Sequence, residues 1–374
     1  MQNKRKPEPK PEPKPKPKPK HFLEFLQLQR ERYRDDPEGM AIIDAWLSNM
    51  GKDGVLLQTQ HPLVSHVLLL GVSAVKGSIA EKLEDERLAG DDYLKVVVED
   101  AWRLNAAVER ESPYHVYIST NLLLFSVRLS ELLLGGFGIS FGGRPHSHEP
   151  QFSTGELADH IRAVLEGFLK DRVIPASEFV LNDQYGVMAT MVQFALLMFI
   201  ACHEFGHVVI HENRNRGREV PFEEFARARL DQAFPKIIEG RRHDPDNRFR
   251  LRGLGNEERR KIYEAWLEEI NADIIAASLA LECLDRQRTF QHLPDRIGLG
   301  KMGIHLGMVI QLFLHVYRNF KDPVYPMISK SHPPIDFRMY CVQLWLYQDR
   351  FVEMVQPWQD YTAEILRAVL EKVE

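Results

Sequence analysis

The stretch Phe194-Ala-Leu-Leu-Met-Phe-Ile-Ala-Cys-His-Glu-Phe-Gly-His207 is an apolar run that ends in the pattern His-Glu-x-x-His. Residues four apart lie on one face of an α-helix, so His203 and His207 can offer two imidazole nitrogens to a single metal ion. Glu204 would then face a water on that ion and take its proton. The spacing predicts a zinc site with His203 and His207 as ligands and Glu204 as general base.

The residues before His203 are apolar on every side of the predicted helix, which indicates a helix buried at the centre of the fold. Two imidazoles and a carboxylate at the end of such a helix are costly to bury without a compensating partner. A bound cation provides that partner. We therefore expect the rest of the chain to pack around this helix and to supply a further ligand.

A catalytic zinc ion needs three protein ligands and one open position, so a third ligand must be found. Metzincins place a glycine three residues after the second histidine and a third histidine six residues after it. Here those positions hold Ile210 and Asn213, which excludes that class. His211 shares the helix face with the two motif histidines but lies about 6 Å further along the axis, so we expect it at the rim of the site.

A better candidate for the third ligand is on a long helix predicted to begin at Asn256. One face of this helix carries Ile262, Trp266, Glu269, Ala272, Asp273, Ala276 and Ala280. The two carboxylates have no basic residue beside them on this apolar face, which is costly unless they meet a metal or its ligands. We predict that Glu269 binds zinc and that Asp273 accepts a hydrogen bond from a ligand imidazole. Glu268 falls on the opposite, charged side and is left out of the predicted site.

Three motifs follow one another in the chain: His203-Glu-Phe-Gly-His207, Glu269-Ile-Asn-Ala-Asp273 and Ser331-His-Pro-Pro-Ile-Asp-Phe-Arg338. Their order resembles the gluzincin zinc metallopeptidases of the HtpX and CaaX-protease kind, over residues 185–345. These relatives usually have clear transmembrane helices, whereas this sequence offers one ambiguous segment. The chain is therefore also similar to a soluble cousin, the Lit-type phage-exclusion peptidases, which are cytoplasmic.

The resemblance implies a role for each matching residue. Zinc would be held by His203, His207 and Glu269, with Glu204 as general base. His332 and Arg338 would lie near the substrate, where His332 could donate a hydrogen bond to the oxyanion formed during acyl transfer.

Composition limits the classes of protein to consider. The chain has 374 residues, 44% of them hydrophobic, which is enough for a substantial core. A net charge of -5 gives no reason to expect nucleic acid as a partner. Three scattered cysteines offer no disulfide framework, and the charged, Pro-rich start has no apolar core of a secretory signal, so we expect a cytoplasmic protein. The uncharged run 184–203 is long enough to span a membrane, but a buried core helix is the favoured interpretation.

The chain divides by pattern into three parts. Residues 1–20 alternate Pro with Lys or Glu and predict a disordered, extended tail. Residues 21–112 predict a helical N-terminal layer, with an apolar stripe from Leu94 to Val108. Residues 113–374 form the predicted metallopeptidase domain, with a charged insertion at 212–255. Within it, residues 114–120 predict a strand that could hold a substrate backbone at a sheet edge, and Ser153-Thr-Gly-Glu156 predicts a helix N-cap.

We therefore predict a mainly α-helical (α+β) fold, with a zincin-like helical core and a small edge sheet. The favoured function is that of a zinc-dependent endopeptidase acting on a protein or peptide substrate. The alternative is a zinc-binding regulatory or protein-interaction module without catalysis. A closed fourth coordination position would favour that alternative.

Overall fold

The computed structural model describes residues 62–99, 107–109, 113–136, 153–174, 183–240, 255–287, 290–291, 295–321 and 331–371. The chain divides into two compact units, Met1–Pro62 and Leu63–Glu374, and every described residue except Pro62 belongs to the second. The predicted tail at 1–20 lies outside the described residues.

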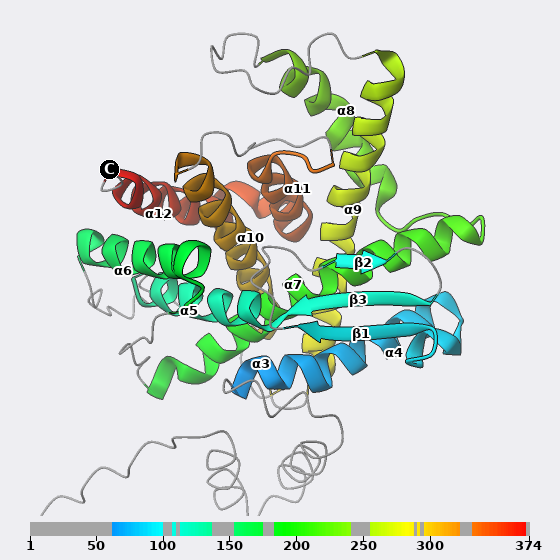
Figure 1. Cartoon of the computed structure of the whole chain (residues 1–374), viewed down its shortest axis with the longest axis horizontal. Coiled ribbons are helices and arrows are strands. Elements are labelled where there is room, and N and C mark those ends of the chain that lie inside the picture. Colours follow the sequence, from blue (N-terminus) through cyan, green and yellow to red (C-terminus); the bar gives the residue numbers. More distant parts are fainter. Residues whose placement is uncertain are drawn as a thin grey trace, which may run out of the picture. The chain divides into compact units, whose positions relative to one another are not determined.

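The described part of the second unit is mostly helical, with one small sheet (Figure 1). The helices are α3 (Pro62–His66), α4 (Val72–Leu83), α5 (Thr120–Gly136), α6 (Thr154–Glu166), α7 (Asp183–Asn215), α8 (Glu223–Gly240), α9 (Asn256–Arg286), α10 (Arg296–Lys321), α11 (Ile335–Tyr347) and α12 (Phe351–Glu371). The strands are β1 (Leu94–Glu99), β2 (Ala107–Glu109) and β3 (Tyr114–Ser119). The predicted mainly helical fold with a small sheet is confirmed.

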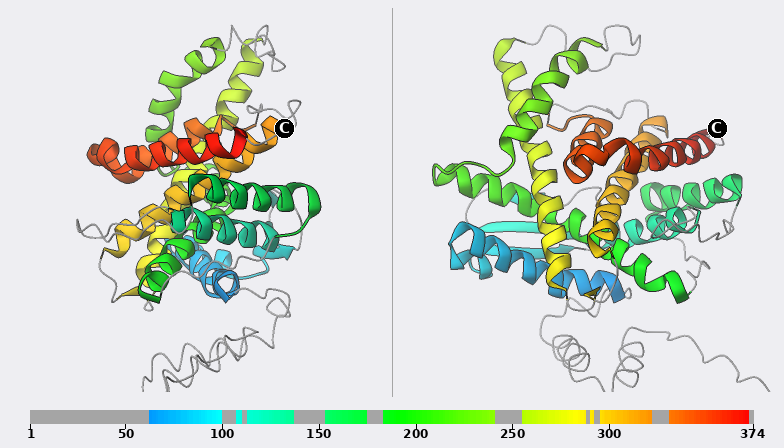
Figure 2. Two further views of the ribbon diagram at one scale, coloured as in Figure 1. Left: turned by 90° about the vertical axis from the view of Figure 1, so that its left-hand side faces the viewer. Right: turned by 180° about the vertical axis from the view of Figure 1, so that it is seen from behind.

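Helix α7 is the centre of the core, as the apolar run predicts. Every residue from Met191 to Cys202 is buried. The helix packs against α9, α10, α5 and α4 and against strands β2 and β3. Figure 2 shows α7 and α9 crossing, with α10 beside them. Because the apolar residues cover all sides of α7, helices can pack on it from several directions.

Two glycines allow close approach between α7 and its neighbours. A Cβ added at Gly206 would lie 2.6 Å from the backbone oxygen of Ala272 on α9. A Cβ added at Gly303 of α10 would lie 2.2 Å from the backbone oxygen of Val192 on α7. Real side chains do not tolerate such contacts, so glycine at each position lets two helix backbones come close. Gly206 lies inside the His-Glu-x-x-His motif and therefore sets the position of α9 beside the motif.

The sheet has the strand order β1-β3-β2, with β1 parallel and β2 antiparallel to β3. The predicted helical stripe from Leu94 to Val108 is therefore wrong where this segment is described, because 94–99 and 107–109 are strands. Three consecutive valines, Val96 to Val98, favour a strand, and pairing with β3 satisfies their backbone groups. Strand β1 precedes the boundary predicted between 112 and 113 and β3 follows it, and the two strands pair in one sheet.

Strand β3 forms at the predicted position, but it is the middle strand of the sheet. Its backbone is paired on both sides, so the prediction that it holds a substrate at a sheet edge is wrong. Its first residue instead ties the sheet to α7. The hydroxyls of Tyr114 and Tyr93 donate to Oε1 of Glu212 at 2.7 and 3.0 Å, and Arg216 donates to the other oxygen of the same carboxylate.

Where it is described, the segment 212–255 forms the end of α7 and helix α8, and one face of α8 is buried. Helix α7 continues to Asn215, and α8 then packs on α9. Ala226 and Leu230 of α8 are buried against Trp266 of α9, and Phe234 makes an edge contact with the same indole. The high charge of the segment hides this apolar face, because the charged side chains occupy the other sides of α8. Residues 241–254 lie outside the described part of the chain.

Among the residues that the structure describes, two helices are long and apolar enough to cross a membrane by length and composition alone. They are Met188–Asn215, the main part of α7, and Arg296–Lys321, which is α10. In the first helix, 89% of the most apolar 18-residue stretch is buried inside the protein, as expected for a core helix.

Candidate metal centre

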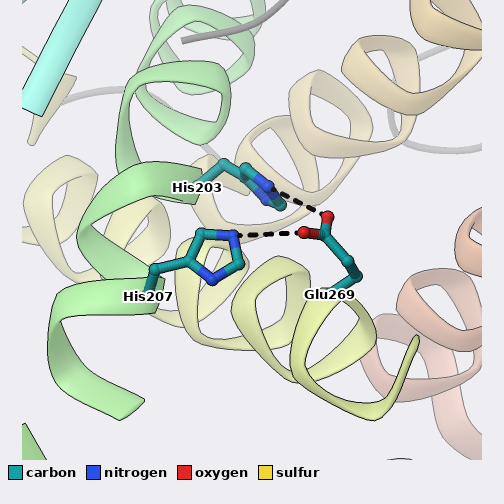
Figure 3. Close-up of side chains that lie close together, drawn as sticks. All are labelled: His203, His207 and Glu269. Atoms are coloured by element: carbon teal, nitrogen blue, oxygen red, sulfur yellow. Dashed lines mark ion pairs between the residues drawn. The ribbon is translucent and has the colours of Figure 1, made fainter. Parts of the chain in front are cut away.

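Three side chains meet where α7 crosses α9 (Figure 3). Nε2 of His203 lies 3.5 Å from Oε2 of Glu269, and Nε2 of His207 lies 3.5 Å from Oε1 of the same carboxylate. The two imidazole rings are perpendicular, with centroids 5.0 Å apart. One ligand atom from each of the three residues lies within 4.8 Å of the others. The fold therefore brings together the ligand set that the sequence predicts, although Glu269 lies more than 60 positions after the two histidines.

The spacing of these atoms suits a small cation. Zinc–nitrogen and zinc–oxygen bonds are about 2.0–2.1 Å, so two ligands at a tetrahedral angle are about 3.3 Å apart. The two nitrogen–oxygen distances of 3.5 Å are close to that value. Oε2 of Glu269 is buried without a hydrogen-bond partner among the described residues, which is costly for a carboxylate oxygen. A cation between the three side chains removes this cost, so the residues present fit a metal ion.

Asp273 lies beside a ligand histidine, as predicted. Its Oδ1 is 2.9 Å from Nδ1 of His203, the ring nitrogen that faces away from Glu269. Asp273 is fully buried, and Arg338 donates to both of its oxygens at 2.7 Å. This bidentate pair fixes the carboxylate, and the carboxylate in turn orients the imidazole.

Arg338, which the resemblance placed near the substrate, lies beside two carboxylates of the centre. Its side chain is buried behind the ligands, donating to Asp273, with Nη1 3.7 Å from Oε2 of Glu269. The structure therefore shows Arg338 supporting Asp273, the carboxylate beside His203.

The charges around the centre shift the pKa values of its members. Burial lowers the pKa of His203, but the carboxylates of Asp273 and Glu269 outweigh burial and raise it to about 10. Burial raises the pKa of Glu269, but His203, Arg338 and His207 together hold it well below its usual range. Burial likewise raises the pKa of Asp273, but Arg338 and His203 outweigh burial and lower that pKa. The carboxylates of Glu269 and Asp273 therefore stay ionised and attract positive charge. A divalent cation satisfies the same attraction as the proton on His203.

Glu204 and His332 occupy different depths at the centre. Glu204 is buried, one residue after His203 on α7. His332 precedes α11, with its side chain 40% exposed and its Nε2 3.6 Å from Oε1 of Glu269. The Ser331 hydroxyl lies 2.8 Å from Nδ1 of the same ring. His332 is therefore a partly exposed side chain that lies close to the carboxylate of Glu269.

Glu268 belongs to the centre although the sequence interpretation left it out. Its Oε1 lies 3.2 Å from Nδ1 of His207, and its Oε2 accepts a hydrogen bond from Arg214 at 2.8 Å. The helical pattern placed Glu268 among exposed charges, but the end of α7 packs against that side of α9. The sequence signal for Glu268 was its position directly before Glu269, because two consecutive carboxylates can contact different atoms of the same site.

His211 lies outside the group of three ligands, as expected. Its Nδ1 is 2.7 Å from the hydroxyl of Tyr114, and the two rings meet edge to face. It therefore contacts the sheet one turn beyond the metal ligands.

Comparisons with protein-family models, with curated proteins and with solved structures found no match. The chain is therefore classified by its site, a helix carrying His-Glu-x-x-His joined by a glutamate from a second helix. This arrangement defines a candidate metal centre formed by His203, His207 and Glu269.

Proposed function

We propose that this chain is a zinc-dependent endopeptidase of the gluzincin type, with a protein or peptide as substrate. The observation that carries the proposal is the convergence of His203, His207 and Glu269, with the buried carboxylate of Glu204 next to the first ligand. Two nitrogen ligands and one carboxylate leave one position for water or substrate, which is the arrangement of catalytic zinc.

The chemistry divides between the ion and the chain. When bound, zinc polarises a peptide carbonyl and lowers the pKa of a water to about 7. Glu204 takes a proton from the attacking water and returns it to the leaving amine. His332 at the exposed side donates a hydrogen bond to the carbonyl oxygen as negative charge develops on it. Asp273 and Arg338 keep His203 oriented throughout.

The exposed side of the centre supports catalysis over a closed structural site. The side chain of His332 is 40% exposed, and that of His203 is 16% exposed. A substrate can thus approach the ligands from the side of residues 331–334. A structural zinc site instead surrounds its metal with four protein ligands.

Substitution of Glu204 by glutamine tests the proposal. The variant keeps the shape and the three ligands, so we expect about one zinc per chain and loss of cleavage by at least 10²-fold. Glu269→Ala removes a ligand, so we expect it to lose the metal. The readout for cleavage is the set of cellular proteins that gain a new terminus when the wild-type chain is expressed.

Glu264→Gln is the matched control, because it removes an exposed carboxylate on α9 one turn before Glu268. It is expected to retain both zinc and cleavage. New termini that persist with Glu204→Gln would reject Glu204 as the base. A wild-type chain without zinc affinity would reject the proposed function as a whole.

A further inference from the structure

The second ligand histidine has its own chain of charged partners. Nδ1 of His207 lies 3.2 Å from Oε1 of Glu268, and Oε2 of Glu268 accepts from Nη1 of Arg214 at 2.8 Å. Arg214 belongs to the last turn of α7, about two turns after His207. The guanidinium therefore reaches back along its own helix to a carboxylate on α9.

This chain repeats the arrangement behind the first ligand. In both cases an arginine holds a carboxylate, and that carboxylate lies next to Nδ1 of a ligand histidine. The two differ in exposure. Asp273 and Arg338 are almost completely buried, whereas the side chain of Glu268 is 14% exposed and that of Arg214 is 40% exposed.

We propose that Glu268 and Arg214 are positioning residues for His207, which strengthen zinc binding through that histidine. The inference rests on the proposed zinc site. Oε1 of Glu268 accepts a hydrogen bond from the Nδ1–H group of His207, which leaves Nε2 facing Glu269 with a free lone pair and makes the imidazole a better ligand. Arg214 holds the second oxygen of Glu268, so the carboxylate is kept in the orientation that His207 needs.

Arg214 also extends the contact to the segment between the ligands. Its Nη2 lies 3.8 Å from Oε2 of Glu223, which belongs to the first turn of α8. Glu223 in turn accepts from Arg227, one turn further along α8. The charged residues of this segment thus form a continuous path from α8 to His207. Some of the charged residues that the sequence alone would place on a solvated connector therefore pair with one another and with Glu268.

Zinc affinity measured by competition with a chelator tests the inference on the full chain. Glu268→Ala is expected to weaken zinc binding by 10- to 100-fold, on the order found for such outer partners. Glu268→Gln keeps an oxygen that can accept from Nδ1, so a smaller loss is expected. Arg214→Ala is expected to weaken binding by up to about 5-fold, because its partly exposed pair contributes little on its own.

The absorption spectrum of the Co²⁺-substituted protein reports ligand geometry independently of fold stability. We expect Glu268→Ala to shift the ligand-field bands, and Glu264→Gln, on the same helix, to change neither the spectrum nor zinc affinity by more than about 2-fold. Unchanged affinity in both Glu268 variants would overturn the inference, as would an equal loss in Glu264→Gln. If Glu268→Ala does not fold, the isosteric glutamine variant decides, because a positioning role predicts a shifted spectrum in it as well. Absence of zinc binding in the wild-type chain would instead reject the proposed function.

Discussion

Replacing Gly206 by alanine is expected to damage the metal centre without touching a ligand. The added Cβ would lie 2.6 Å from the backbone oxygen of Ala272, about 0.8 Å short of the 3.4 Å at which ordinary contacts begin. The added Cβ is bonded to the backbone of α7, and the oxygen of Ala272 belongs to the backbone of α9, so a side-chain rotation cannot relieve the clash. Helix α9 must move away from α7 by a similar amount. Ala272 is one turn after Glu269, so the ligand carboxylate moves with it.

The size of this shift decides the effect on metal binding. Metal–ligand distances tolerate about 0.2 Å, so a displacement of about 0.8 Å either lengthens the contact of Glu269 or strains the helix pair. Overpacking of this kind costs about 1–3 kcal/mol, of which the better helix propensity of alanine returns about 1 kcal/mol. We expect zinc affinity to fall by at least about 10-fold, which corresponds to 1.4 kcal/mol. Chelator competition measures it directly.

Gly303→Ala is the matched control for this experiment. Its Cβ would lie 2.2 Å from the backbone oxygen of Val192, so it overpacks the same helix α7, about 16 Å from His203 along the axis. Urea unfolding should show destabilisation of both variants by about 1–3 kcal/mol, whereas only Gly206→Ala should lose zinc affinity. Equal zinc affinities in the two variants would refute the idea that Gly206 sets the position of the ligand glutamate.

Other perturbations test the core and the charge distribution. Burial lowers the pKa values of His66 and His305 to about 4, so the neutral forms stabilise the fold above pH 6.5 and this stability is lost as the pH falls toward 4. Urea unfolding should therefore lose about 2 kcal/mol per histidine between pH 7 and pH 5, and His305→Gln should show a weaker pH dependence than the wild-type chain; an equal slope would contradict this. Trp266→Ala should cost about 3–5 kcal/mol in the same assay, because the indole is fully buried between α8 and α9; a loss below about 1 kcal/mol would show that α8 does not pack there. Ser153→Ala removes the predicted and observed capping box of α6 and should cost about 0.5–2 kcal/mol, with the exposed Thr154 replaced by alanine as the comparison.

The ligands could be predicted from the sequence because each lies on a helix with a clear pattern. The four-residue spacing of His203 and His207 fixes their common face, and the apolar face around Glu269 makes its carboxylate anomalous. Asp273 follows from the same face. These inferences depend on positions within one helix, and helix geometry is local.

The features that sequence reasoning missed depend on contacts between distant segments. Glu268 lies at the edge of the buried face of α9. Its place in the site becomes visible only when the end of α7, which carries Arg214, is seen packed beside it. Strand β1 was assigned to a helix because Leu94, Val97 and Val98 also fit a helical period. Its pairing with β3, which arises from residues 20 positions later, decides between the two structures. The apolar face of α8 was missed because charged residues outnumber the few buried apolar ones, such as Ala226 and Leu230, in that segment.

The metal ligands stand on two helices of 33 and 31 residues, which make the most extensive helix contact in the described part of the chain. A bend in either helix would disturb the packing around the three residues of the candidate metal centre. Under the proposed function, we expect the short segment Ser331–Pro334, which carries His332 and belongs to neither helix, to contribute to selectivity. If the proposed cleavage is observed, exchanging residues around His332 is expected to alter its preference while leaving His203, His207 and Glu269 in place.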